Sequence, residues 1–567
     1  MKFQLSPDLR PDLPDLNPDQ EPNLSPALSS AAEMDLDEPA FFTINDDIPI
    51  PKSYKAAMAG EHKEFWAAAC QAEIDSLGDM KTWILQDLPP GFKAIGTKWV
   101  FDIKYNLDGT LNRFKARLVA QGFTQRPGQD YNEVFAPVAK HATIRYIISL
   151  AAHPSACLGQ LDISTAFLNG VLEEELYCKQ PPGFEVGFKA CRMIKCLYGL
   201  KQASRQWYLQ VKSDLLKLGL NEVDADQGLF VLPGATDILL WLVLWVDDFF
   251  LLCFNQVLLD KYKASIGALY KTRDLGDPAV FVGYEITRDR TKGTIHICQS
   301  HYIKQLLKSA NLTAQTGSFC YPYPIPMDPN TPLPYPHKDA PVNILPLAAI
   351  VGSLNYLAVC TRPDIAQAVN RLARHSSKPM AEHMAAATGI LRYLAGTPTH
   401  GILYTSSRAP SMTGFTDSDH ASCQLTRKST TGYVFLNQGG AIQWQSKLQQ
   451  SSTALSSTEA EYVAASQAAQ EALWLLKLKH NAGEPPSSIT IEGDNQACLN
   501  AWNQDKLSTR LRHLETRYFF LKEEAKKGGI VLSWILTAAN AADMFTKPLP
   551  RIKFQQFRTA IGCVAKP

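Results

Sequence analysis

The feature that most constrains the fold is the apolar run at residues 238–254, ILLWLVLWVDDFFLLCF, with Asp247 and Asp248 in its middle. As a membrane span it would bury two carboxylates at roughly 2.5–3.5 kcal/mol each, and the apolar stretch that they interrupt is too short to cross a bilayer. Branched and aromatic residues instead predict a buried β-hairpin. Residues 238–246 and 249–254 form its strands, and the two aspartates form its turn.

Two adjacent carboxylates on a rigid hairpin repel each other unless a cation lies between them. Hard oxygen ligands on a stiff scaffold are typical of a divalent metal site. An isolated Asp-Asp pair is more often a polar turn. Here the apolar flanks and a third carboxylate, Asp162, at the end of another apolar stretch, favour the metal site. Carboxylates from separate strands that hold two Mg²⁺ ions suit the joining of a nucleotide to a primer end.

A second set of acidic residues lies in the last third of the chain: Asp417, Glu461, Asp494 and Asp543. One ends a predicted strand, one lies on a predicted helix, one follows another strand and one begins a late helix. Four acidic groups from four elements suit a second metal pair, used for phosphodiester hydrolysis. Scattered acidic residues are usually surface residues, and that interpretation would prevail without the motifs described below.

Length and charge set the domain number and the class of partner. The 567 residues exceed one hydrophobic core and predict three or four domains. Residues 1–50 carry eleven acidic and two basic residues and are rich in proline, which predicts disorder. With a net charge of +1 overall, the remainder carries +10, which is compatible with a polyanionic partner. The scattered cysteines and the lack of a secretory signal predict core thiols in a reducing compartment.

Further elements follow from periodicity. A hairpin at residues 98–119 places Lys115 and Arg117 on one face, where they would bind a triphosphate, although a solvated strand face is an equally good interpretation. Before a helix that ends near residue 218, Gly199 would let the backbone approach a ligand and Gln202 would offer an amide. Other helices are predicted at 64–77, 301–310, 347–359, 364–374, 381–394, 457–477, 495–502 and 515–527. Further strands are predicted at 279–286, 294–298, 401–404, 414–417, 433–436, 441–446, 489–493 and 530–535, and the proline-rich segment 321–346 is predicted to be extended.

Several motifs carry a resemblance to a known family. WVFDIKYNLDGTLNRFKARLVAQGFTQ, DYNEVFAPV, LDISTAFLNG, LYGLKQASRQW and WVDD resemble the reverse transcriptase of copia-type LTR retrotransposons. GSLNYLAVCTRPDI and ILRYLAGT resemble the connecting region of that family. FTDSDHA, TRKSTTGYVF, ALSSTEAEYVA, GDNQA and ADMFTKPL resemble its ribonuclease H. The motifs occur in the family's order from about Ser53 to Pro550.

The resemblance implies roles for individual residues. Polymerase metal ligands would be Asp162, Asp247 and Asp248, and ribonuclease metal ligands would be Asp417, Glu461, Asp494 and Asp543. Phe167 would be the steric gate against a 2′-hydroxyl, Lys115 and Arg117 would contact the triphosphate, and Gln202 would line the nucleotide pocket. The primer grip would be Phe281, Val282, Gly283 and Tyr284. Two positions depart from the family: Trp245 replaces the usual tyrosine and is expected to reshape the primer end, and His420 replaces the usual tryptophan.

The implied fold is an α+β and α/β multidomain protein: a right-hand polymerase, a connection, and a ribonuclease H-like domain with a mixed five-stranded sheet. The predicted boundaries are 1–50 for the disordered N-terminus, 51–298 for fingers and palm, 299–345 for thumb and linker, 346–411 for the helical connection, 412–550 for the ribonuclease and 551–567 for a tail. No capsid, protease or integrase motif precedes Ser53, so we expect the end of a larger polyprotein or a genomic relic.

The resemblance also implies an enzyme that copies RNA into DNA and degrades the RNA of the hybrid, with two Mg²⁺ per site and Mn²⁺ as a substitute. Its partners would be an RNA template, a DNA primer, the RNA–DNA hybrid and dNTPs, with a homodimer or other polyprotein domains as further partners and no membrane. The implied location is the cytoplasm, within a virus-like particle, and the nucleus. Two rivals stay open: a catalytically inactive nucleic-acid-binding relic, and a transposase or integrase, which the Asp-Asp hairpin disfavours.

Overall fold

The computed structural model describes residues 48–105, 111–310, 321–335, 346–406, 412–449, 454, 456–485, 487–503, 523–524 and 526–567. They belong to one compact unit, Phe42–Pro567. The predicted disorder of residues 1–50 falls almost entirely outside the described residues, as does most of the helix predicted at 515–527.

The first part of the chain forms a small apolar core around a two-stranded hairpin. Helices α1 (Tyr54–Ala59) and α2 (Lys63–Asp79) precede strand β1 (Trp83–Gln86) and the hairpin strands β2 (Thr97–Tyr105) and β3 (Leu111–Ala120). The side chains of Trp99, Phe101 and Ile103 alternate along β2 and are buried, so the predicted hairpin is confirmed. A three-stranded sheet in the order β1-β6-β5 adds β5 (Tyr177–Cys178) and β6 (Ala190–Met193) to this core.

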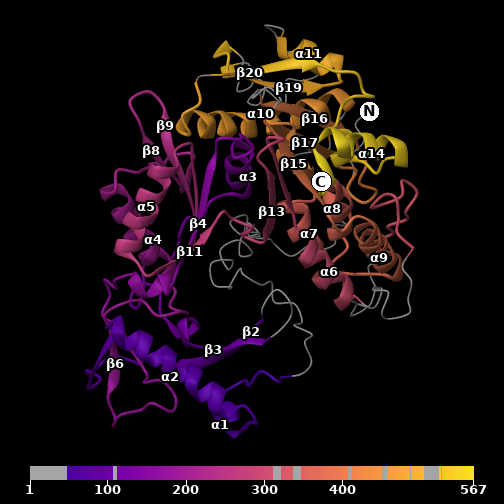
Figure 1. Ribbon diagram of the computed structural model, residues 1–567. Coiled ribbons are helices and arrows are strands. Elements are labelled where there is room, and N and C mark those ends of the chain that lie inside the picture. The colour runs from indigo at the N-terminus through magenta and orange to yellow at the C-terminus, as the bar shows by residue number, and fades with distance from the viewer. Residues whose placement is uncertain are drawn as a thin grey trace, which may run out of the picture. The chain divides into compact units, whose positions relative to one another are not determined.

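A six-stranded antiparallel sheet, here the central sheet, follows in the order β11-β4-β10-β9-β8-β7 (Figure 1). Its strands are β4 (Cys157–Ile163), β7 (Asn221–Val223), β8 (Asp226–Pro233), β9 (Ile238–Trp245), β10 (Asp248–Cys253) and β11 (Thr272–Gly276). Helices α4 (Ala203–Lys217) and α5 (Gln256–Leu269) share an apolar core with one face of it. The other face packs in a different core with α3 (His141–Leu150).

The predicted Asp-Asp hairpin is confirmed, but its turn lies one residue earlier than expected. Strands β9 and β10 pair with Trp245 opposite Asp248, so the turn consists of Val246 and Asp247, and Asp248 already belongs to β10. Val246 has a φ of 53°, a left-handed conformation that a β-branched residue rarely adopts. Residue propensity therefore predicted the two aspartates as the turn, whereas the register of the strands places Val246 and Asp247 there.

A five-stranded antiparallel sheet, here the joining sheet, connects distant parts of the chain in the order β12-β13-β14-β15-β21. Its strands are β12 (Val280–Phe281), β13 (Tyr284–Asp289), β14 (Thr294–Cys298), β15 (His400–Thr405) and β21 (Cys563–Ala565). The stretch 279–286, predicted as strand, contains a tight turn at Val282 and Gly283, both with positive φ. Residues 551–567, predicted as a tail, form α14 (Arg551–Ala560) and the edge strand β21.

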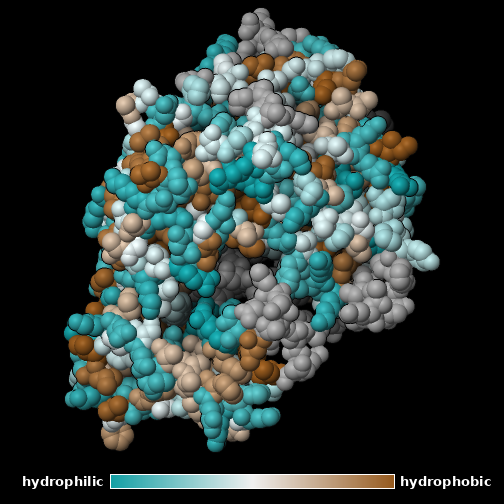
Figure 2. Space-filling view, in the orientation of Figure 1, coloured by the Kyte–Doolittle hydropathy of each residue, from teal (hydrophilic) through white to brown (hydrophobic). Residues whose placement is uncertain are grey.

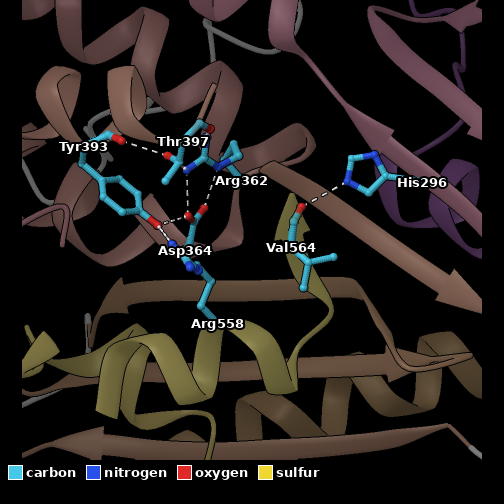
Figure 3. A network of polar contacts seen from close by, with 7 residues as sticks. All are labelled: His296, Arg362, Asp364, Tyr393, Thr397, Arg558 and Val564. Carbon is cyan, nitrogen blue, oxygen red and sulfur yellow. Dashed lines mark hydrogen bonds and ion pairs between the residues drawn. The ribbon is translucent and has the colours of Figure 1, made fainter. Parts of the chain in front are cut away.

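Helices surround this sheet at about their predicted places: α6 (Ser300–Ser309), α7 (Leu347–Cys360), α8 (Ala366–Ala373) and α9 (Ala381–Gly396). Figure 3 shows a fully buried ion pair, in which Arg362 makes two hydrogen bonds to Asp364, at 2.9 and 2.8 Å. The Tyr393 hydroxyl of α9 donates to Asp364 and accepts a hydrogen bond from Arg558 of α14. This network ties the C-terminal helix to the helices that precede β15.

The last sheet, here the terminal sheet, is mixed and five-stranded, as predicted, in the order β18-β17-β16-β19-β20. Its strands are β16 (Thr413–Asp419), β17 (Thr430–Asn437), β18 (Gly440–Leu448), β19 (Ile489–Gly493) and β20 (Ile530–Trp534), with β19 parallel to both neighbours. Helix α10 (Ser457–Asn481) packs on it and is capped by Ser456; α11 (Gln496–Asn503) and α13 (Asp543–Thr546) follow.

One continuous apolar core joins α3, a face of the central sheet, helices α7 to α9 and the terminal sheet. The cysteines that the structure describes are free thiols, nearly all of them buried. On the face drawn in Figure 2, exposed apolar side chains are scattered among hydrophilic ones. Among the described helices, none combines the length and the apolar character that a bilayer crossing requires.

Candidate active sites

The first site lies where β4 and β10 of the central sheet run side by side. Asp162 and Asp248 are direct partners across these antiparallel strands. Directly opposed residues place their side chains on the same face of a sheet, so the two carboxylates are neighbours. Asp247 lies in the adjoining turn, and its carbonyl accepts a hydrogen bond from the Ile163 amide at 2.8 Å. The structure thus brings the three predicted polymerase carboxylates to one end of the sheet.

A tryptophan stabilises the turn that carries Asp247. The Trp207 indole of α4 donates a hydrogen bond to the Val246 carbonyl at 2.6 Å. The left-handed Val246 is a strained conformation that persists only where its surroundings determine it. The hydrogen bond from Trp207 and the pairing of the two flanking strands hold Val246 in this conformation.

The predicted nucleotide-binding cations lie on β3. Lys115 and Arg117 are half-buried on one face, while Ala116 and Leu118 point into the core. The Arg117 guanidinium lies 5.7 Å from the centre of the Tyr198 ring, and Tyr198 in turn meets Phe167 edge-on at 5.4 Å. The predicted steric gate Phe167 lies in the short helix η3 (Ala166–Asn169). The Tyr198 ring therefore contacts both Phe167 and Arg117 of β3.

Sequence reasoning missed Tyr198, although it stands in the YGLKQ motif directly before Gly199. Its carbonyl accepts a hydrogen bond from Ala120 at the end of β3, at 2.7 Å. A side chain on Gly199, which has a φ of +84°, would approach the Ala120 carbonyl oxygen to 2.3 Å. The glycine therefore permits close approach of the chain to β3, whereas we had expected close approach to a ligand.

Gln202 is 1% exposed, and protein groups occupy its amide. Its Nε2 donates to the Asp130 carbonyl at 3.0 Å and to Glu174 at 3.1 Å, while its Oε1 accepts from Gln125 at 3.0 Å. The structure does not leave this amide open to a ligand, so its assignment to the nucleotide pocket stays a prediction that requires these bonds to break.

The predicted primer grip is the β12–β13 hairpin. Phe281 and Tyr284 are buried, the turn residue Val282 is half-buried against the same core, and Gly283 is exposed. Phe281 packs against Phe250, two residues after Asp248, with ring centres 5.2 Å apart. On the other side, Tyr284 bonds His141 at 2.7 Å, and the His141 ring also contacts Trp245. The hairpin is thus packed against the strand pair that carries the aspartates.

The second site lies at one edge of the terminal sheet. Asp417 lies near the end of β16 and Asp494 follows β19, and these neighbouring parallel strands bring both carboxylates to the same edge. Glu461 joins them from the second turn of α10. In the part of the chain that the structure describes, this is the one group of three metal-ligating residues whose ligand atoms lie within 4.8 Å of one another. Three hard carboxylate oxygens at this spacing fit a divalent cation.

Burial gives this cluster an unusual protonation state. It raises the pKa of Glu461 to about 9, with Asp417 and Asp494 adding to the effect. It also raises the pKa of Asp417 to about 7, although Lys547 acts in the opposite direction. A cation bound here would replace protons, because only the carboxylate form is a ligand.

The fourth predicted ligand, Asp543, does not join this group. It is fully buried and paired with two lysines: Lys547 at 2.8 Å and Lys553. Lys547 also lies 3.8 Å from Asp417, and Thr546 donates a hydrogen bond to Asp417. His420, at the position where the family has tryptophan, hydrogen-bonds to the Ala454 carbonyl at 3.1 Å.

Comparisons with known proteins show which proteins this chain resembles. The model of the family described as reverse transcriptase (RNA-dependent DNA polymerase) matches residues 80–328. The Pol polyprotein of transposon TNT 1-94 from Nicotiana tabacum is 37% identical over 92% of this chain and 39% of its own length. That of transposon RE1 from Arabidopsis thaliana is 36% identical over 90% of this chain and 35% of its length. The putative transposon Ty5-1 protein of Saccharomyces cerevisiae is 30% identical over 55% of this chain and all of its own length.

The chain belongs to the reverse transcriptase family of copia-type retrotransposon Pol proteins. It spans little more than a third of the length of the two plant polyproteins. Among solved structures, the ribonuclease H1 of Halobacterium salinarum NRC-1 is 19% identical over 24% of this chain, and its TM-score of 0.18 is too low to bear on the fold.

Proposed function

We propose that this chain is an RNA-directed DNA polymerase that also hydrolyses the RNA strand of RNA–DNA hybrids, as expected for a copia-type retrotransposon. The observation that carries the polymerase assignment is the direct pairing of Asp162 with Asp248 beside Asp247, in a chain of the reverse transcriptase family. Mg²⁺, or Mn²⁺ in its place, would supply activation of the primer 3′-hydroxyl and neutralisation of the leaving pyrophosphate when held by these carboxylates.

The remaining work falls to the chain's own side chains. Lys115 and Arg117 bind the triphosphate from β3, as two cations on one strand face. Phe167 blocks the space that a 2′-hydroxyl would need, and Tyr198 positions both Phe167 and Arg117. The turn of Val282 and Gly283 contacts the primer backbone through its exposed glycine. The template, primer and dNTPs are therefore the proposed substrates, with little sequence readout.

The ribonuclease assignment depends on the cluster of Asp417, Glu461 and Asp494. These carboxylates would hold a divalent cation against the scissile phosphodiester of the RNA strand. Both activities would take place in a complex with the hybrid, in the cytoplasm or the nucleus.

The deciding experiment is Mg²⁺-dependent extension of a DNA primer on an RNA template. The original chain should extend the primer, and Asp247→Asn/Asp248→Asn should not. A matched control is Asp237→Asn, because Asp237 is an exposed aspartate in the turn at the other end of β9. Extension equal in all three variants would refute the metal assignment. Hybrid binding by all three with no extension by any would instead support the inactive relic.

For the ribonuclease, Asp494→Asn should abolish cleavage of the RNA strand and leave primer extension intact. Glu523→Gln is the matched control, since Glu523 is an exposed carboxylate in the same part of the chain. Cleavage that persists in Asp494→Asn would show that the cluster is not the hydrolytic site.

A further inference from the structure

His141, the first residue of α3, contacts both hairpins of the polymerase site. Its ring lies 5.5 Å, centre to centre, from the Trp245 indole, and its Nδ1 lies 2.7 Å from the Tyr284 hydroxyl. Trp245 ends β9 directly before the aspartate turn, and Tyr284 begins β13 in the predicted primer grip. One imidazole therefore lies between the aspartate hairpin and the grip hairpin.

The Trp245 side chain shares a face of the central sheet with two of the proposed metal ligands. Trp245 is the direct partner of Asp248, and Asp248 is the direct partner of Asp162. Directly opposed residues of antiparallel strands place their side chains on one face. The indole is half-buried and packs against the core that contains α3. A change in its position would therefore act where the primer end has to meet the cations.

The first turn of α3 is anchored on β8. The buried Asp226 carboxylate accepts hydrogen bonds from the Lys140 amide at 2.8 Å and from the Thr143 hydroxyl at 2.5 Å. A carboxylate at the N-terminus of a helix binds a backbone amide that the helix itself leaves without a partner. The backbone of His141 is thus fixed relative to the central sheet.

Contacts at both ring nitrogens fix the orientation of the His141 imidazole. Arg145 donates to the Tyr284 oxygen at 3.5 Å, so the proton of the Tyr284 hydroxyl is directed to Nδ1 of His141. Nε2 then carries the ring proton and faces Sγ of Cys360 at 3.8 Å. Burial and the Arg145 charge lower the pKa of His141 to about 3, so the ring that contacts the indole is neutral.

We propose that His141 positions the Trp245 indole, and through it the primer end, so that the grip hairpin and the aspartate hairpin keep one fixed relation. This inference rests on the proposed polymerase function, and it makes His141 a positioning residue because it acts through Trp245. Without the imidazole, the indole gains room beside Asp248 and the primer 3′-hydroxyl loses its alignment. A misplacement of about 1 Å can slow a reaction about 100-fold.

The test is single-turnover extension of a DNA primer on an RNA template at several dNTP concentrations. His141→Ala should lower the maximal rate at least about ten-fold and leave the dNTP affinity and the amplitude nearly unchanged. A loss of amplitude at the parental rate would overturn the proposal, since it marks a merely structural role. His383→Ala is the matched control: the His383 ring is buried in α9 and bonded to the Met380 amide and the Pro334 carbonyl, both at 2.9 Å. It should leave the rate unchanged.

A double-mutant cycle tests whether His141 acts through Trp245. Trp245→Leu should also slow extension, and adding His141→Ala to it should change the rate less than about two-fold, because coupled residues are not additive. Losses that multiply would overturn the proposal, and so would a parental rate in folded His141→Ala. Circular dichroism confirms that each variant is folded, and His141→Leu replaces His141→Ala if the latter is not.

A fluorine NMR measurement does not depend on turnover. In protein labelled with 5-fluorotryptophan, the resonance that Trp245→Phe removes reports on the Trp245 indole. His141→Ala should narrow this resonance, as expected of an indole that has become mobile, and His383→Ala should not. A narrowed resonance in a chain that extends no primer supports the positioning role, and the proposed polymerase function alone then fails. A resonance of parental width in His141→Ala overturns the proposal.

Discussion

Asp248 of β10 faces Asp162 of β4 across one antiparallel strand pair and Trp245 of β9 across the other. A slip of one residue in either register would send one of these side chains to the opposite face of the sheet. The buried strands on both sides fix the register, because each has one face in the core with α4 and α5 and the other in the core with α3. The positions of the metal ligands are thus a consequence of sheet packing.

The first prediction concerns the tryptophan that holds the turn. Trp207→Phe keeps an aromatic ring against Tyr270 but removes the hydrogen bond to the Val246 carbonyl. A buried acceptor without its partner costs about 1–3 kcal/mol, so we expect a loss of that size in the free energy of unfolding. If about 1.4 kcal/mol of it reaches the transition state, the extension rate falls about ten-fold. Urea unfolding and single-turnover extension measure the two effects.

The control for this variant is Trp474→Phe. The Trp474 indole donates to the Ala225 carbonyl at 2.8 Å, in the turn between β7 and β8 and not in the turn of Val246 and Asp247. It should lower stability by a similar amount without slowing extension. Equal slowing in both variants would mean that global stability, and not the turn, limits the rate.

The second prediction is a pH dependence of metal stabilisation. Burial raises the pKa of Glu461 to about 9 and of Asp417 to about 7, from ordinary values near 4.5 and 3.8. Between the ordinary and raised values, the metal-free folded chain binds more protons than the unfolded chain. Its free energy of unfolding therefore falls as pH rises, by at most about 1.4 kcal/mol per pH unit and group.

Mg²⁺ binds the carboxylate form and counteracts this loss. The rise in melting temperature caused by Mg²⁺ should therefore grow from pH 6 to pH 9 in the Asp247→Asn/Asp248→Asn background. In Glu461→Gln most of that growth should disappear. A shift that is the same at all pH values, or that Glu461→Gln leaves unchanged, would contradict the assignment of the cluster.

The sequence was sufficient for elements whose pattern is local. Alternating apolar residues predicted β2, β9 and β10, and acidic residues near strand ends pointed to carboxylates that the structure brings together. It was not sufficient where a distant side chain decides. The left-handed conformation of Val246 depends on Trp207, 39 positions earlier. Asp543 lies outside the carboxylate cluster and pairs with two lysines, and a periodic sequence pattern does not reveal such pairing. Gln202 is engaged by Gln125 and Glu174, which lie in other parts of the chain.

The third prediction concerns Arg145, which joins α3 to the terminal sheet. Its buried guanidinium donates to the carbonyls of Ile442, Val359 and Cys360 at 2.7–2.9 Å and lies 4.0 Å from the Trp444 ring centre. Arg145→Met leaves three buried carbonyls without a partner, each at a cost of about 1–3 kcal/mol. We expect the single melting transition to split into two in calorimetry, because Arg145 couples the part of the core around α3 to the terminal sheet.

Arg392→Met is the matched control. Arg392 makes the same kinds of contact, to the Tyr321 carbonyl at 2.8 Å and the Tyr323 ring at 4.0 Å, but it is half-exposed. It should leave one transition at nearly the original temperature. If the melting transition splits in both variants, or in neither, Arg145 does not couple these two parts of the fold.

The fourth prediction compares two Arg–Asp pairs that differ in burial. Arg362 and Asp364 are fully buried, and although burial raises the pKa of Asp364, the Arg362 charge outweighs it and lowers that pKa to about 2 (Figure 3). Asp364→Asn leaves a buried guanidinium without its counter-charge, and removing one partner of such a pair costs about 3–5 kcal/mol. Asp277→Asn breaks the pair with Arg290 at 3.2 Å, whose partners are about half exposed, and should cost less than about 1 kcal/mol.

Because Asp364 also anchors Tyr393 and through it Arg558, limited proteolysis of Asp364→Asn should release the C-terminal helix α14 first. Equal losses of stability in the two variants, or an unchanged cleavage pattern, would show that the buried network does not hold the C-terminal segment in place.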